Sequence, residues 1–324
     1  MQLTISEQFQ KYMKSIGIDL NDTLQKAGVN QILWKEHLEL NNSEYWRLMN
    51  ELDNELSDEN IVELSEINKM NTFMPAFFAS LTAENGLEAL KRLAKYKSLV
   101  GPVKLDIVDN GTETKIQISG NELSIEPPRF TVMTEQLLVL SLLRTGTAKD
   151  IVPIKVCSNN DYGQIISNVF QIKPQRQAEN EIIFRDADLQ DSFISSNNVM
   201  WEFIRPELDR RKLEIESSKQ LGDNIQALLI KKIPSGKFGI DDIAENLNIS
   251  RRTLQRNLKN LNTSFNDQVK YARQTLVDPF MKDESLSLID ISYLLGYADP
   301  ESFSRAFKTW YKKSPSIYRK QVLN

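Results

Sequence analysis

The sequence IDDIAENLNISRRTLQRNLK, from Ile240 to Lys259, is repeated in outline by IDISYLLGYADPESFSRAFK, from Ile289 to Lys308. Matched positions lie 48 residues apart in the first half of the two copies and 49 apart in the second half, as for Arg256 and Arg305. The one-residue difference falls in a turn, where a loop absorbs an insertion easily. Each copy therefore predicts a short amphipathic helix, a tight turn and a second helix, which is the helix-turn-helix pattern of DNA-binding proteins.

The residues around each turn support this prediction. Asn248 and Gly296 begin the two turns, and both residue types tolerate the positive φ that such turns often need. Ser250 precedes the second helix of the first copy. Asp299, followed by Pro300, precedes the second helix of the second copy. Since Ser and Asp are good N-cap residues and Pro suits the first helical position, we expect the second helices to begin there.

The second helices have one apolar face and one basic face. Apolar residues recur at helical spacing and are predicted to point inward, namely Leu254, Leu258, Phe303, Ala306, Phe307 and Trp310. No acidic residue occurs from Ser250 to Asn260 or from Ser302 to Lys320, although both stretches hold several Lys and Arg. A solvated charged face is the simpler interpretation of one basic helix. Two copies with matched caps, cores and basic faces favour DNA binding.

The outward residues of the second helices are the candidate DNA contacts. Arg can pair with guanine, Gln with adenine, and Glu can accept a hydrogen bond from cytosine. The candidate base readers are therefore Arg252, Gln255 and Arg256 in the first copy and Glu301, Ser302 and Arg305 in the second. Lys259, Lys308 and Lys312 are expected to contact phosphates, which set affinity rather than sequence preference. Arg251 completes the predicted DNA-binding face, for which double-stranded DNA is the partner.

Three segments also resemble the signature of AraC/XylS-type transcription regulators: Gly296-Tyr297, SFSRAFK from Ser302 to Lys308, and SPSIYR from Ser314 to Arg319. The resemblance spans about the last hundred residues. It implies two helix-turn-helix units joined by a linker helix, operator DNA as the target and RNA polymerase as a further partner. Phe265–Val277 corresponds to the linker helix, with Arg273 at a position that is usually basic. Pro279 departs from the family pattern and is expected to kink or end that helix.

Charge is distributed unevenly along the chain of 324 residues. Its formal net charge is −4, but residues 231–324 hold 16 Lys and Arg against 10 Asp and Glu, a net charge of +6. The remainder is therefore at −10, as expected if only the C-terminal part meets phosphate. No apolar run approaches the ~20 residues that a membrane span requires, and we see no signal peptide. Together with a single cysteine, Cys157, this predicts a cytoplasmic protein without a membrane partner.

The N-terminal part is predicted to be an α+β domain. Helical patterns run through Ser6–Ile16, Leu20–Ala27 and Ser43–Leu56, and restart at Leu87. Strands are predicted over Val103–Val108, Thr114–Ile118, Leu123–Ile125, Ile151–Val156 and Glu181–Phe184, with helices over Phe130–Leu143 and Tyr162–Val169. Asn110-Gly111 between the first two strands is a strong hairpin signal. The expected fold is thus an α+β domain (residues 1–195), a connecting helical segment (196–232) and an all-α domain with two helix-turn-helix units (233–324).

The function of the N-terminal domain is less determined by its residues. The order of elements from Gly17 to Asp191 resembles the regulatory domain of one AraC/XylS subgroup, which implies that it senses a small-molecule effector or mediates self-association as a homodimer. No effector-binding residue can be assigned, and a cavity between helix and sheet is its expected place. A slight preference for an apolar or mixed ligand follows from the lack of an obvious charged clamp.

Two alternative classes of function exist for such a chain. One is a protein-interaction factor that binds no operator, and the other is an enzyme with a DNA-binding tail. The sequence has no phosphate-binding loop, no nucleophile elbow and no His-Glu-x-x-His motif. One His (His37) and one Cys cannot build the usual zinc sites. We therefore expect no catalytic residue, no metal and no cofactor.

Overall fold

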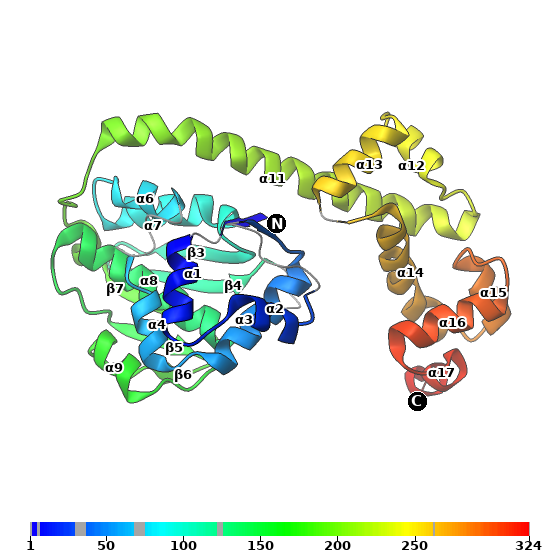
Figure 1. The fold of residues 1–324 in the computed structure, drawn as a ribbon, viewed down its shortest axis with the longest axis horizontal. Helices are drawn as coiled ribbons and strands as arrows, with labels where there is room; N and C mark the ends of the chain where they lie inside the picture. The colour runs from blue at the N-terminus through cyan, green and yellow to red at the C-terminus, as the bar shows by residue number, and fades with distance from the viewer. Residues whose placement is uncertain are drawn as a thin grey trace. The chain divides into compact units, whose positions relative to one another are not determined.

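The computed structural model describes residues 2–4, 7–29, 37–67, 75–121, 126–261 and 263–323. The chain divides into two compact units, Met1–Ile215 and Glu216–Asn324, and each is described by itself. Helix α11 (Asn198–Lys232) belongs in part to each unit (Figure 1). The architecture is α+β in the first unit and all-α in the second, which confirms the predicted fold class.

The N-terminal unit begins with helices. Their bounds are α1 (Glu7–Ser15), α2 (Leu20–Lys26), α3 (Asn42–Glu55), α4 (Asp58–Leu64), α6 (Pro75–Leu81) and α7 (Gly86–Tyr96), followed by the 3-10 turn η1 (Lys97–Leu99). Two short strands, β1 (Gln2–Thr4) and β2 (His37–Glu39), pair antiparallel. The predicted helices near residues 6–16, 20–27, 43–56 and 87 onward are confirmed, whereas the small sheet, α4 and α6 were not predicted.

A five-stranded sheet follows, in the spatial order β3-β4-β7-β5-β6. The strands are β3 (Val103–Asp109), β4 (Glu113–Gly120), β5 (Lys155–Ser158), β6 (Gln175–Arg176) and β7 (Glu181–Arg185). The predicted hairpin is confirmed, since Asp109 pairs with Thr114 and Gly111 has a φ of +87° in the turn. The Asn110 side chain accepts hydrogen bonds from the backbone N–H of Thr112 and of Glu113, which fixes the turn.

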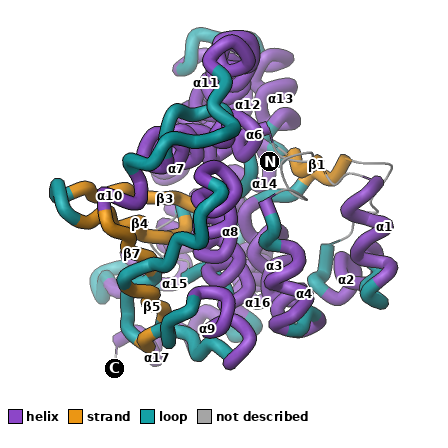
Figure 2. The backbone as a smooth tube through the Cα atoms, turned by 90° about the vertical axis from the view of Figure 1, so that its left-hand side faces the viewer, coloured by secondary structure: helices purple, strands orange, loops and turns teal. Residues whose placement is uncertain are grey.

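Helix α8 (Arg129–Thr147) is the centre of the N-terminal unit. Figure 2 shows it beside the sheet, and the buried Gln136 donates to the backbone oxygens of Cys157 and Glu181 on two neighbouring strands. Fourteen of its residues are buried, including Leu137, Leu140 and Leu143. An apolar helix of this kind must be covered on several sides. The helices α3, α4, α6 and α7 all contact α8 and supply part of that cover.

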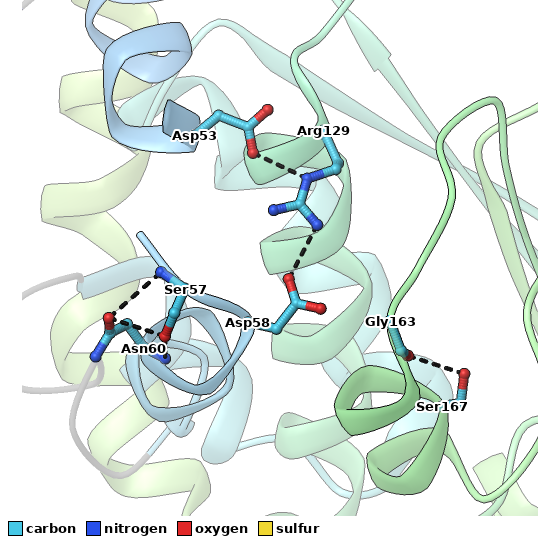
Figure 3. Close-up of polar contacts among 7 residues, drawn as sticks. All are labelled: Asp53, Ser57, Asp58, Asn60, Arg129, Gly163 and Ser167. Atoms are coloured by element: carbon cyan, nitrogen blue, oxygen red, sulfur yellow. Dashed lines mark hydrogen bonds and ion pairs between the residues drawn. The ribbon is translucent and has the colours of Figure 1, made fainter. Parts of the chain in front are cut away.

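Arg129, the first residue of α8, joins this helix to α3 and α4 (Figure 3). Its Nε donates to Asp53 at 3.1 Å and its Nη1 to Asp58 at 3.0 Å. The hydrogen bond to Asp58 raises the pKa of the guanidinium, although burial acts in the opposite direction. In the same view, the Ser57 and Asn60 side chains cap the start of α4, and Ser167 donates to the Gly163 backbone oxygen in α9 (Gln164–Phe170).

Some predicted boundaries were wrong. The strand expected over Ile151–Val156 begins only at Lys155, because Pro153 has no N–H to donate to a ladder. The expected strand Leu123–Ile125 lies outside the described residues. Helix α11 is continuous around Pro206. Pro206 is exposed, so the carbonyl that loses its partner can be hydrated. A short helix, α10 (Asp186–Leu189), also follows β7.

The C-terminal unit contains two small cores. The elements are the end of α11, η2 (Ile233–Ser235), α12 (Ile240–Asn246), α13 (Arg251–Asn260), α14 (Phe265–Lys282), α15 (Leu288–Leu294), α16 (Pro300–Tyr311) and α17 (Pro315–Leu323). In the first core, Ile225 and Leu229 of α11 pack with Ile243, Leu254 and Leu258. In the second, Phe303 and Phe307 pack with residues of α14, α15 and α17. The linker helix α14 contributes to both cores.

The predicted linker helix is longer than expected. It begins at a capping box formed by Ser264 and Asp267 and continues through Pro279 to Lys282. Pro279 is exposed, while Val277 and Met281 on either side of it are fully buried in the second core. The burial of these two side chains offsets the hydrogen bond that the proline cannot make. The expectation that Pro279 could end the helix is therefore wrong.

Candidate nucleic-acid interface

The first candidate recognition helix, α13, is held by local signals in the sequence. The Ser250 hydroxyl accepts a hydrogen bond from the Thr253 N–H at 3.1 Å, which confirms Ser250 as the N-cap. Asn248 has a φ of +54°, as expected for the start of this turn. Leu254 and Leu258 are 0% and 1% exposed, so the apolar face points into the core. Local chemistry thus determines where α13 begins and which of its faces is free.

The second candidate recognition helix, α16, is built in the same way. The Asp299 side chain accepts from the Ser302 N–H at 2.7 Å, with Pro300 in the first turn. This hydrogen bond lowers the pKa of the Asp299 carboxyl. Gly296 has a φ of +72°. Phe303 and Phe307 are buried, and Trp310 packs against the same core while remaining partly exposed.

Nine of the ten predicted DNA contacts have exposed side chains, all on α13, on α16 or at the residue that ends α16: Arg251, Arg252, Gln255, Arg256, Lys259, Glu301, Arg305, Lys308 and Lys312. The tenth, Ser302, is half-buried, and its hydroxyl donates to Asp299 at 2.8 Å. Its role in this structure is therefore to complete the cap of α16, which the sequence did not indicate.

Two of the candidate arginines have acidic neighbours. Arg251 Nη1 lies 3.1 Å from Asp241 of α12, and Arg305 Nη1 lies 3.9 Å from Glu301. Both pairs are largely exposed, so they are weak and cost little to exchange for phosphate or a base edge. Arg305 also donates to the Ser302 hydroxyl at 2.9 Å. For Arg252, Arg256 and Lys259 no ion pair is found among the residues that the structure describes.

Two further arginines have structural roles. Arg273 of α14 donates to the backbone oxygens of Leu295 and Gly296, both at 2.8 Å. Arg319 of α17 donates to the backbone oxygens of Asp283 and Leu286, both at 2.6 Å. Arg319 lies in the basic stretch from Ser302 to Lys320, but its guanidinium is used within the domain. A guanidinium can satisfy two carbonyls at once, and nothing in sequence spacing distinguishes that use from a DNA contact.

The small residues of the first helices are buried. Ala244 is 3% exposed and Ser292 is 0% exposed. Since both positions are buried, a larger side chain at either would have to displace its neighbours. The geometry of both units thus follows the pattern that the duplicated sequence predicts.

Comparison with known proteins agrees with this geometry. The family described as "Helix-turn-helix domain" matches residues 243–321. The chain is 34% identical over 100 residues to the Msm operon regulatory protein of Streptococcus mutans, covering 29% of this chain and 36% of that protein. It is 35% identical over 95 residues to the ornithine utilization regulator of Pseudomonas aeruginosa, covering 29% and 28% of the two chains. The matched part is thus about a third of these curated relatives.

A solved structure aligns with most of the chain. It is the transcriptional regulator CdpR from Pseudomonas aeruginosa, with a TM-score of 0.43 and 16% identity, covering 93% of this chain and 96% of that one.

These matches define the class of the C-terminal unit. Residues 243–321 form a helix-turn-helix domain of the AraC type, and the relatives that share it are transcription regulators. The resemblance to AraC/XylS-type regulators is therefore confirmed for this domain. Among the residues that the structure describes, no helix is both long and apolar enough to cross a membrane, and no group of three metal-binding side chains is found.

Proposed function

We propose that the chain is a sequence-specific DNA-binding transcription regulator, and that its N-terminal unit responds to a small molecule or mediates self-association. One observation carries the first part: two capped helices, α13 and α16, expose the basic faces that the sequence predicted and bury the opposite faces. RNA polymerase as a partner, a cytoplasmic location and the absence of catalysis belong to the same proposal. They are supported by the relatives, whose names describe regulators.

In the proposed mechanism, the two helices enter successive major grooves on one face of the duplex, about 34 Å apart. Arg252, Gln255 and Arg256 read bases from α13, and Glu301 and Arg305 read bases from α16. Lys259, Lys308 and Lys312 contact phosphates, together with Arg251. Ser302 holds the first turn of α16 and so orients Glu301 and Arg305 rather than reading a base itself.

The test is selection of genomic fragments by the full chain over a series of salt concentrations. We expect enrichment of one operator sequence, protection of two segments one helical turn apart, and an affinity that falls linearly on a log-log plot against salt. Equal binding to all fragments would favour a protein-interaction factor, and it would contradict the proposal.

A charge-matched pair of variants makes the test specific. Replacing Lys259 and Lys308 with Ala removes two positive charges from the proposed interface. Replacing Lys91 and Lys104 with Ala removes two charges from exposed sites of the N-terminal unit, where their side chains are 53% and 58% exposed. We expect the first variant to lose about two units of salt slope and the second to lose none.

A further inference from the structure

Within the N-terminal unit, helix α11 is apolar on two opposite faces. Trp201, Ile204 and Leu208 form the inward face, which packs against α6 and α7 (Figure 1). The Tyr96 hydroxyl of α7 also donates to Asp209 of α11 at 2.8 Å. The inward face is therefore covered by the unit to which it belongs.

The outward face of the same segment is exposed, although it is apolar. Val199, Phe203 and Leu213 are 83%, 80% and 62% exposed. Pro206, which lies between them in the sequence, is exposed as well. A surface helix of a globular protein usually has one apolar stripe and one polar face. A second apolar stripe that remains exposed marks a surface that another protein segment covers.

The outward residues have the spacing of a coiled-coil seam. Val199, Phe203, Pro206, Arg210 and Leu213 follow one another at intervals of four, three, four and three residues. This alternation is that of the a and d positions in a heptad repeat, which lie on one side of a helix. At 1.5 Å per residue, this outward stripe is about 21 Å long. A second helix is therefore the shape of partner that fits it.

Arg210 is the charged member of the outward stripe. Its guanidinium donates to Glu207 at 2.8 and 2.9 Å and to Glu214 at 2.6 Å, all on α11. The three side chains are 56%, 48% and 63% exposed, so these ion pairs are weak and can be exchanged. The stripe thus carries a cation and its flank carries carboxylates. Such a face can be complementary to a reversed copy of itself, as an interface with two-fold symmetry requires.

We propose that the outward stripe of α11 binds the same stripe of a second copy of this chain, with the two helices antiparallel. Phe203 of each chain lies opposite the partner's Leu213. Arg210 packs its aliphatic stem on the partner's Pro206 and donates to the partner's Glu207. This inference deepens the proposed function and rests on it for its meaning, because it gives the self-association a surface.

The charge of Arg210 selects the antiparallel arrangement. In a parallel pair of helices, identical residues face each other, so two Arg210 guanidinium groups would meet within an apolar seam. Their repulsion and their desolvation both oppose that arrangement. In the antiparallel pair, each Arg210 lies beside a carboxylate instead. A different protein would have to supply a carboxylate opposite Arg210, whereas a second copy already provides Glu207.

The dimer is expected to be weak but useful for DNA binding. A seam of about two heptads is short for a coiled coil, so we expect a dissociation constant of roughly 1–10 µM. A dimer carries two DNA-binding domains. When one domain is bound to DNA, the other binds at a high effective concentration, which raises the affinity for an operator with two sites.

The test is sedimentation equilibrium of the full chain at concentrations below and above this constant. Val199→Glu with Phe203→Glu places two carboxylates in the seam and should raise the dissociation constant by at least about a hundredfold. The thermal transition should be unchanged, because both side chains are exposed. Ile289→Glu with Tyr293→Glu is the matched control. These side chains of α15 are 55% and 56% exposed and also lie four residues apart, and we expect this variant to dimerise like the wild type.

Two results would overturn the proposal. One is a wild type that stays monomeric over the whole range of concentrations. The other is a dimer that persists in the variant Val199→Glu with Phe203→Glu, because another surface would then join the chains.

Introduced cysteines determine the direction of the helices. The double variant Phe203→Cys with Leu213→Cys should form an intermolecular disulfide on mild oxidation, because the antiparallel pair brings these positions together. Neither single variant should do so, since the two copies of one position lie about 15 Å apart along the helices and a disulfide needs Cα atoms within about 7 Å. The native Cys157 is fully buried. Cross-linking of either single variant would indicate a parallel pair and overturn the arrangement.

Operator selection measured on the same preparations separates this inference from the proposed function. Selection of DNA by a wild type that is monomeric throughout would support the regulator and overturn the dimer surface. A dimer with the expected cross-links that selects no DNA would leave the surface standing and contradict the regulator.

Discussion

Arg273 Nη2 donates to the backbone oxygen of Gly296 at 2.8 Å, and Nε of the same guanidinium donates to Leu295 at the same distance. The group also lies 4.1 Å from the centre of the Tyr297 ring. A residue of the linker helix thus holds the turn of the second helix-turn-helix unit. The orientation of α16 depends on this contact, although Arg273 itself is not among the proposed DNA contacts.

Replacement of Arg273 with Ala is expected to lower the free energy of unfolding of the C-terminal unit by about 2–4 kcal/mol, because two charge-assisted hydrogen bonds and a cation–π contact are lost. Arg273→Lys should recover only part of this, since Lys cannot bond both carbonyls in the fork geometry of Arg. Urea denaturation measures the effect. Equal stability of the Lys and wild-type chains would show that the charge alone matters.

Gly296 and Gly236 form a matched pair for testing the turn. Both have a φ of +72°, but a Cβ at Gly296 would lie 2.5 Å from Cε1 of Phe238, whereas one at Gly236 would meet nothing. We expect Gly236→Ala to cost about 1–2 kcal/mol from backbone strain. Gly296→Ala should cost about 1–3 kcal/mol more, because Phe238 must move. Thermal denaturation of the two variants checks this, and equal losses would exclude the steric contribution.

Ser292 and Ala244 occupy the same place in the two repeats. Ser292 Oγ is buried without a hydrogen-bond partner among the described residues, whereas Ala244 has no polar group to satisfy. Ser292→Ala is expected to raise the free energy of unfolding by about 1 kcal/mol, and the reciprocal Ala244→Ser to lower it by about 1–3 kcal/mol. A loss of stability in Ser292→Ala would indicate a partner for this hydroxyl, such as an ordered water.

Arg252 and Lys308 are expected to differ in the kind of DNA binding that they support. Arg252→Ala should reduce discrimination between operator and scrambled DNA by about 1–3 kcal/mol, because a base contact is lost. Lys308→Ala should weaken binding to both sequences alike, because a phosphate contact carries no sequence information. Binding curves with both duplexes at one salt concentration decide this. If Arg252→Ala loses the same affinity for both duplexes, Arg252 does not read a base.

Tyr318 predicts a dependence of stability on alkaline pH. Its hydroxyl donates to Asp278 at 2.7 Å, and this hydrogen bond, followed by burial, raises the pKa of Tyr318 to about 12. The ordinary value is about 10. Because the folded pKa is raised, the stabilisation is fully present below pH ~10 and is lost as the pH rises towards ~12. The melting temperatures of the wild type and of Tyr318→Phe should differ below pH ~10 and converge above it. A difference in melting temperature that is constant with pH would contradict this assignment.

The candidate interface could be predicted largely from the sequence because its determinants are local. The caps at Ser250 and Asp299, the positive φ at Asn248 and Gly296, and the alternation of buried and exposed faces each depend on residues within one or two turns. Ser302 was the exception among the candidate contacts. The Ser302 hydroxyl can either cap a helix or contact a DNA base, and only the geometry shows that it donates to Asp299.

The sequence by itself determined the two repeats, their helices and the segregation of positive charge into residues 231–324, since these follow from spacing, capping and composition. Only the tertiary structure decided which arginines hold the domain together and that α14 continues through Pro279. It alone brought Lys97 and Glu135 together, from helices separated by two strands. Such contacts join residues far apart in the chain, where side-chain chemistry permits many partners and packing selects one.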